Sequence, residues 1–121
     1  MQAEEPAMPP NATVILERVG PTALIHVTGE VDMASEELLR KHLSDARAEE
    51  PSSLVLDLSG VTFFASAGLH VLVDLYHDAA AQGVRLLVVA TSRIVLRPMQ
   101  ITGVDQLVTL VDSVDQAMAH S

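Results

Sequence analysis

The stretch Asp57-Leu58-Ser59-Gly60-Val61-Thr62-Phe63-Phe64-Ala65-Ser66-Ala67-Gly68-Leu69 decides the fold that we predict for this chain. It continues the apolar run at residues 54–56, which is typical of a β-strand covered on both faces. After a short turn the spacing of apolar residues becomes helical, at Leu69, Leu72, Val73, Tyr76 and Ala80. We therefore predict a central strand at 53–58 and a helix at 66–82 that ends at Gly83.

Ser66 stands where this helix is predicted to begin, and two interpretations of it are open. As the N-cap, its hydroxyl would bond one of the backbone N–H groups that the first helical turn leaves unpaired. The same N–H groups, together with the positive end of the helix dipole, also favour an anion. A phosphate carried by Ser66 would therefore be well placed.

The segments on either side alternate between strand and helix patterns. Before the central strand we predict a hairpin of strands at 13–19 and 23–28, a turn at 29–32 and a helix at about 35–49. After Gly83 we predict a strand at 84–90, a short helix or turn at 92–101 weakened by Pro98, and a short strand at 109–111. Ser113 and Gln116 have capping-box spacing and open a terminal helix. This alternation predicts an α/β fold with a largely parallel sheet.

The composition indicates one domain at residues 12–121, preceded by a loose leader at 1–11 that contains three prolines. Apolar residues make up 49% of the chain but aromatic residues only 2%, so the core must consist of Leu, Val, Ile and Ala. The chain has no cysteine, which excludes disulfides and thiolate metal sites.

The charge balance limits the partners. Seven basic against 16 acidic residues give a formal net charge of −9, which argues against nucleic acid and against anionic membrane surfaces. A basic surface on a protein partner would be attracted. The first residues lack the pattern of a signal peptide, and no apolar run is long enough to span a membrane. We therefore expect a cytoplasmic protein.

Neither metal binding nor catalysis is favoured by the residue pattern. His70 and His77 share a helix face with Asp74 and Asp78, but without a metal-binding motif a solvated face is the better interpretation. Ser66 lies in A-S-A-G and not in the G-x-S-x-G of an α/β-hydrolase elbow. Glycine-rich phosphate-binding motifs are also absent from the sequence. We expect no cofactor and no enzymatic activity.

Two aspartates have positions that need an explanation. Asp57 interrupts an apolar strand, and we expect it to lie at the strand's exit and to bond nearby backbone, in preference to a functional role. Asp32 lies in the loop before the first helix. Since functional groups gather at the carboxyl ends of parallel strands, we expect Asp32 on the same surface as Ser66.

Three segments resemble STAS domains, particularly bacterial anti-sigma factor antagonists: Gly29-Glu30-Val31-Asp32, the leucine-bearing helix after it, and the strand and turn at residues 54–69. The resemblance covers residues 13–118. It implies a four-to-five-stranded sheet packed with about four helices, and function by protein binding. In that family the unphosphorylated antagonist docks on an anti-sigma factor that is a serine kinase, which frees the sigma factor. Phosphorylation of the antagonist's serine ends the docking, and a phosphatase restores it.

The resemblance also implies a site. The family's D-S-[S/T]-G-L motif matches Ala65-Ser66-Ala67-Gly68-Leu69, so Ser66 takes the position of the phosphoacceptor, and Asp32 matches the family's loop aspartate. These residues are the implied partner-binding set. Ala65 replaces the acidic residue before the acceptor, which removes one negative charge beside an incoming phosphate. We hypothesise that phosphorylation of Ser66 weakens partner binding without a global rearrangement.

A second function on the same fold is also open. Small stand-alone STAS proteins resemble the accessory subunit of lipid-transporting ABC systems, which docks on the ATPase without a phosphorylation cycle. The substitutions at Ala65 and Ala67 give this alternative some weight.

Overall fold

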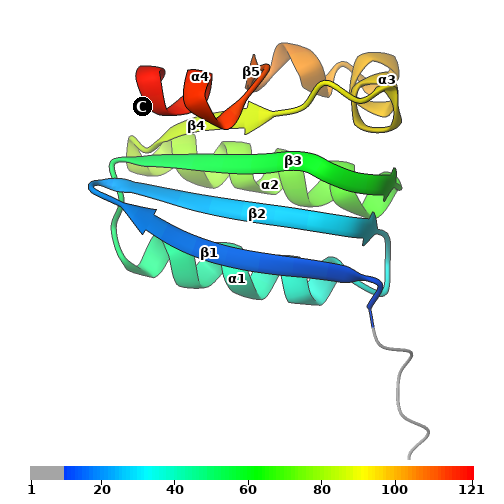
Figure 1. The fold of residues 1–121 in the computed structure, drawn as a ribbon, viewed down its shortest axis with the longest axis horizontal. Helices are drawn as coiled ribbons and strands as arrows, with labels where there is room; N and C mark the ends of the chain where they lie inside the picture. Colours follow the sequence, from blue (N-terminus) through cyan, green and yellow to red (C-terminus); the bar gives the residue numbers. More distant parts are fainter. Residues whose placement is uncertain (1–9) are drawn as a thin grey trace, which may run out of the picture.

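The computed structural model describes residues 10–121, which form an α/β fold with a five-stranded sheet in the order β1-β2-β3-β4-β5 (Figure 1). Only β1 and β2 pair antiparallel, so the predicted largely parallel sheet is confirmed. Most of the predicted leader lies outside the described residues. The elements are β1 (Ala12–Val19), β2 (Thr22–Val31), α1 (Glu36–Ala48), β3 (Ser53–Phe64), α2 (Ser66–Gln82), β4 (Arg85–Val89), α3 (Arg93–Thr102), the 3-10 helix η1 (Val104–Gln106), β5 (Thr109–Val111) and α4 (Val114–His120).

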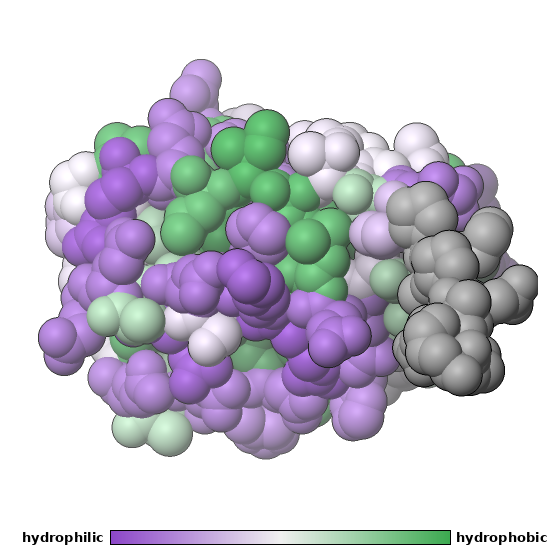
Figure 2. Space-filling model, turned by 90° about the horizontal axis from the view of Figure 1, so that it is seen from below, coloured by the Kyte–Doolittle hydropathy of each residue, from purple (hydrophilic) through white to green (hydrophobic). Residues whose placement is uncertain are grey.

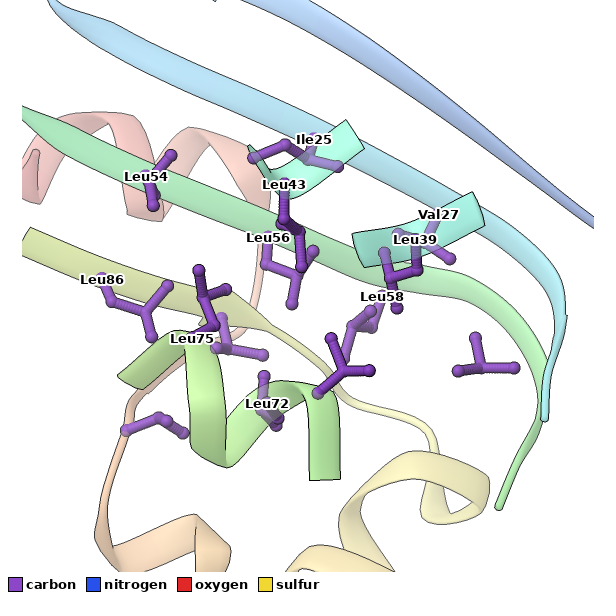
Figure 3. Close-up of a cluster of buried hydrophobic side chains, with 14 of the residues drawn as sticks. Ile25, Val27, Leu39, Leu43, Leu54, Leu56, Leu58, Leu72, Leu75 and Leu86 are labelled. Carbon is purple, nitrogen blue, oxygen red and sulfur yellow. The ribbon is translucent and has the colours of Figure 1, made fainter. Parts of the chain in front are cut away.

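The core has two parts, one on each face of the sheet. On the larger side, α1, α2 and α3 pack against inward-facing strand residues such as Ile25, Leu56 and Leu58, all buried (Figure 3). On the other face, Ala117 of α4 packs with Val55 and Leu87 in a smaller cluster. Since β3 contributes to both clusters, its residues are apolar on both faces, which explains the uninterrupted run in the sequence.

β2 and β3 are both longer than predicted, and the turns predicted at 29–32 and after residue 58 were wrong. The pairing register shifts between His26 and Thr28 and again between Gly29 and Glu30, and the two strands continue to the pair Val31–Phe64. Such bulges bend a strand without ending it. Gly29 makes the second shift feasible, because its φ is +91° and a Cβ there would collide with the carbonyl of Asn11.

The last part of β3 has no partner on the β4 side, whereas β1 follows β2 almost to its end. Pairing of β3 with β4 ends at Asp57–Val89, and pairing of β1 with β2 ends at Ala12–Gly29. Beyond the last pair of β1 and β2, the carbonyl of Asn11 still accepts the N–H of Glu30 (2.8 Å). β1 therefore runs beside β2 almost to the corner at the right of Figure 1, where α2 and α3 lie close to the ends of β2 and β3.

The last two helices, α3 and α4, begin close to where they were predicted to begin. Ser113 Oγ accepts the N–H of Gln116 (3.0 Å), which confirms the capping of α4 predicted from the spacing. The segment for which a short helix or turn was predicted is the ten-residue helix α3, which continues past Pro98.

The β1 edge of the sheet is open to solvent. Figure 2 views this edge together with α1 and shows apolar surface near the middle, surrounded by hydrophilic side chains. Ile15 and Val19 are the large apolar residues exposed on β1, while the charged Glu17 and Arg18 discourage pairing with another strand. Among residues 10–121, no helix is both long and apolar enough to cross a membrane.

The start of α2 packs very closely on the ends of β2 and β3. Gly68 is buried, and a Cβ at this position would lie 2.7–2.9 Å from the Phe64 ring and 2.8 Å from Cγ1 of Val31. Glycine at this position therefore allows α2 to approach the ends of β2 and β3 closely.

Substitution of Gly68 tests this packing. Helix propensity alone would make Gly68→Ala stabilising by about 1 kcal/mol. We expect instead that the crowding against Phe64 and Val31 lowers the free energy of unfolding by about 1–3 kcal/mol, measured by urea denaturation. A variant more stable than wild type would contradict the close contact.

Candidate protein-binding site at the ends of β2 and β3

The two loops that carry Asp32 and Ser66 leave the sheet side by side. β2 and β3 pair up to Val31 and Phe64, and the N–H of Ala65 donates to the carbonyl of Val31 (2.9 Å). Asp32 and Ser66 therefore each follow a strand that ends at the same corner. The parallel pairing, extended by the two bulges, produces this arrangement.

Ser66 is not the N-cap of α2, and that prediction was wrong. Ala65 is the N-cap, with φ −91° and ψ 178°, and Ser66 is the first helical residue. The physical reason is the length of β3: the strand continues to Phe64, so that a single residue makes the transition to the helix. The Ser66 side chain is exposed and makes no hydrogen bond to any described residue.

The backbone around Ser66 is suited to a negative charge. The carbonyl of Ala65 accepts the N–H groups of Gly68 (2.9 Å) and Leu69 (3.4 Å), so the N–H groups of Ser66 and Ala67 precede the first bond of the helix. The first turn of α2 contains no acidic residue. An anion at Ser66 would therefore meet the positive end of the helix dipole without repulsion from an acidic side chain of this turn.

Asp32 organises its own loop. Its carboxylate accepts the N–H groups of Ala34 (3.0 Å) and Ser35 (3.2 Å). The buried Ser35 hydroxyl accepts the N–H of Asp32 (2.9 Å) and donates to the carbonyl of Glu30 (2.8 Å). These bonds hold the loop so that Met33 is 81% exposed at its tip.

A shallow depression connects the two loops, lined by Met33, Glu36, Ala65, Ser66, Ala67 and His70. Three residues of the predicted partner-binding set thus lie together on its surface. Of the others, Gly68 is buried beneath the helix start, Leu69 lines a neighbouring groove, and Asp32 supports the loop that carries Met33.

Sequence reasoning missed Met33, Glu36 and His70. The position of His70 could have been found, because it lies four residues after Ser66 and therefore on the same helical face. Met33 and Glu36 come from the other loop and the next helix, which only the folded chain brings to Ser66.

The acidic residues of α2 pair with α1 and not with the histidines of their own helix. Asp74 bonds Arg40 (2.9 Å) and Asp78 bonds Arg47 (3.1 Å). Within residues 10–121, no three His, Cys, Asp or Glu side chains are arranged to hold a metal ion.

Asp57 belongs to a polar network on the sheet face opposite α1 and α2. Its Oδ1 accepts the N–H (3.0 Å) and the hydroxyl (2.6 Å) of Ser59, so the predicted bonding to nearby backbone is confirmed. The expected location at the strand's exit was wrong, because β3 continues for seven residues after Asp57.

His26 extends this network. Its Nδ1 bonds Asp57 Oδ2 (2.9 Å), and its Nε2 bonds Glu17 (3.1 Å). Ser59 contacts the carboxylate and not the imidazole, so the arrangement lacks the order of a catalytic triad.

The network changes the protonation of both central groups. Burial lowers the pKa of His26, but the hydrogen bonds and charges of Asp57 and Glu17 outweigh it, and the pKa is raised above 6.5. Burial raises the pKa of Asp57, but the hydrogen bonds from Ser59 and His26 outweigh it, and the pKa is lowered below 3.8. His26 therefore links β1, β2 and β3 across the sheet, and the network favours its charged form.

The family model described as "STAS domain" matches residues 13–117. The chain belongs to the STAS domain family. Among curated relatives, the STAS chain is 29% identical over 110 residues to the anti-sigma-F factor antagonist RsfB of Mycobacterium tuberculosis, covering 91% of this chain and 89% of RsfB.

Solved structures agree with this assignment. An anti-sigma factor antagonist from Mycobacterium paratuberculosis is 30% identical, with a TM-score of 0.84 over 90% of this chain and 92% of that one. The unphosphorylated form of SpoIIAA, at 20% identity, has a TM-score of 0.76 over 89% of this chain and 95% of its own. The phosphorylated form of SpoIIAA from Bacillus is 19% identical and has a TM-score of 0.70, over 89% of this chain and 98% of its own. The two SpoIIAA forms show a shared fold.

A substitution at Ser66 tests by stability whether its side chain caps α2. Since its hydroxyl bonds no described residue, we expect Ser66→Ala to change the free energy of unfolding by less than about 0.5 kcal/mol. Ser92 is the matched control, because its side chain accepts the N–H of Ile94 (3.1 Å) at the start of α3. Ser92→Ala should cost about 1 kcal/mol in a urea titration. Equal losses for the two variants would restore a capping role for Ser66.

The His26 network gives a pH-dependent test. The raised pKa of His26 contributes stability below pH 6.5 that is lost as the pH rises through the folded-state value. The lowered pKa of Asp57 contributes stability above pH 3.8 that is lost on acidification. We expect His26→Gln to lower the free energy of unfolding by about 1 kcal/mol or more at pH 5.5, and by less at pH 8.5. The exposed His77→Gln serves as the control, and a loss independent of pH would argue against a charged His26.

Proposed function

We propose that this STAS domain is an anti-sigma factor antagonist: it binds an anti-sigma factor of the serine kinase type, frees a sigma factor, and is switched by phosphorylation of Ser66. One observation carries the proposal. Ser66 presents a hydroxyl without a hydrogen-bond partner among residues 10–121 at the first turn of α2, in a depression beside the exposed Met33. The names of the RsfB and Mycobacterium paratuberculosis relatives support the same role.

The proposed docking face consists of Asp32, Ala65, Ser66, Ala67, Gly68 and Leu69, to which Met33 is added. Ala65 and Ala67 have small side chains, so a partner can approach the backbone of the helix start closely. Gly68 allows α2 to pack closely on Val31 and Phe64, and Asp32 holds the loop that carries Met33. The exposed thioether of Met33 suits an apolar contact with the partner.

Phosphorylation would act on the interface and leave the fold intact. A phosphoserine adds a charge of about −1.5 to −2, and the N–H groups at the start of α2 stabilise it locally. The carboxylate of Glu36, which lines the same depression, is paired with Arg40 at 2.9 Å, so the added charge would be presented mainly to the partner. Bulk and charge at Ser66 would therefore remove a partner that fits the unmodified surface. The occurrence of the same fold in both forms of SpoIIAA is consistent with a local effect.

The kinase and the phosphatase complete the proposed cycle. The partner kinase would transfer phosphate to the Ser66 hydroxyl, and a serine phosphatase would remove it. The net charge of −9 would steer a basic surface of the partner toward this chain. Because sigma factors act on the transcription machinery, the proposed role places the chain in the cytoplasm.

Capture of partners from the native cell tests the proposal. Wild type, Ser66→Asp and Ser113→Asp are used as baits, and bound proteins are quantified by mass spectrometry. Ser113→Asp is the matched control, because it adds the same charge at the N-cap of α4, which packs on the other sheet face. We expect wild type and Ser113→Asp to recover a serine-kinase anti-sigma factor, and Ser66→Asp to recover at least about tenfold less.

Two other outcomes would overturn parts of the proposal. Equal recovery of the anti-sigma factor by Ser66→Asp would remove the switch and leave the antagonist role. Recovery of transporter subunits by all three baits would support the accessory subunit of an ABC system instead.

A further inference from the structure

Helix α3 differs in charge from the rest of the chain. Four of the seven basic residues, Arg18, Arg40, Lys41 and Arg47, form ion pairs. Arg93 and Arg97 of α3 form none with residues 10–121, and α3 contains no acidic residue. Arg93 and Arg97 therefore form an exposed cationic patch on a protein whose net charge is −9.

This charge is not explained by the stability of the helix. Arg93 is the first residue of α3, where the positive end of the helix dipole disfavours a cation by about 0.3–1 kcal/mol. Acidic residues occupy the corresponding first turn of α1. A cation at this position of α3 is better suited to an external anionic group than to the helix itself.

An apolar groove lies beside the two arginines, between α3 and the corner where β3 meets α2. Arg93 and Arg97 line it together with apolar residues. Phe63 is 52% exposed, Ile94 47% and Ile101 73%. Ile94 and Ile101 are seven residues apart, so they lie on one face of the helix, while Val95 and Met99 face the core.

We propose that this groove docks an acidic amphipathic helix of a partner protein. Apolar side chains spaced at i, i+3, i+4 and i+7 on such a helix would fit along Phe63, Ile94 and Ile101. Carboxylates on its flanks would pair with Arg93 and Arg97, at the one place among the described residues where two unpaired arginines border an exposed apolar surface. The remaining surface carries the excess of acidic residues, which disfavours an anionic membrane as the occupant.

The groove adjoins the depression around Ser66. Leu69 lines the groove, while Ala65, Ser66 and Ala67 line the depression one turn earlier on α2. A single partner can therefore cover both. The assignment of the acidic helix to the anti-sigma factor rests on the proposed function, whereas the chemistry of the groove does not.

The test uses two fluorescein-labelled helical peptides of about 18 residues with identical leucine faces, flanked by glutamates in one and by lysines in the other. Binding to the full chain is measured by fluorescence anisotropy. The net charge of −9 predicts tighter binding of the lysine peptide. We expect the opposite order, with the affinity for the glutamate peptide falling as salt is added.

Charge-reversed variants locate the binding. Arg97→Glu and Arg85→Glu change the net charge equally, but Arg85 opens β4 and does not line the groove. We expect Arg97→Glu to weaken the glutamate peptide by at least about fivefold and Arg85→Glu to leave it unchanged. Arg93→Glu should act like Arg97→Glu and is expected to keep its fold, because it places a favourable charge at the start of α3.

Three results would overturn the proposal: no binding of the glutamate peptide, a preference for the lysine peptide, or equal weakening by Arg97→Glu and Arg85→Glu. Self-association of the chain that Arg97→Glu abolishes would assign the groove to a second copy instead. The capture experiment with Ser66→Asp is separate, so the proposed function and the acidic-helix chemistry can fail independently.

Discussion

The continued pairing of β2 with β3 is the constraint on which the candidate site depends. Two register shifts allow the strands to pair as far as Val31 and Phe64, beyond the points where β1 and β4 leave them. The loop of Asp32 and the start of α2 therefore emerge next to each other. If the strands ended where their apolar patterns end, Met33 and Ser66 would not line one depression.

Charge is distributed to match this geometry. Most basic residues are used within the fold: Arg40 and Arg47 connect α1 to α2, and Arg18 bonds Glu49. The start of α2 carries no acidic residue, while α3 carries two arginines without partners among the described residues. The start of α2 and helix α3 thus differ from the acidic first turn of α1, which lies beside the start of α2.

Most of the fold was predictable because its signals are local. The apolar run of β3, the helical spacing of α2 and the capping spacing at Ser113 each depend on neighbouring residues, and all three predictions are confirmed as elements. The errors lie where a strand departs from regular pairing. A bulge at Gly29 has the same local composition as a turn, so the end of β2 was misplaced and a turn was predicted at 29–32. The N-cap predicted at Ser66 followed from the misplaced end of β3.

The amino-acid sequence by itself determined the α/β class and the order of the elements, because both follow from periodicity and residue type along the chain. The tertiary structure alone decided which side chains meet. It placed Met33 and Glu36 beside Ser66, bonded His26 to Asp57 and aligned Arg93 and Arg97 along an apolar groove. The physical reason is that register, bulges and helix packing depend on contacts between residues far apart in the chain, which no local pattern records.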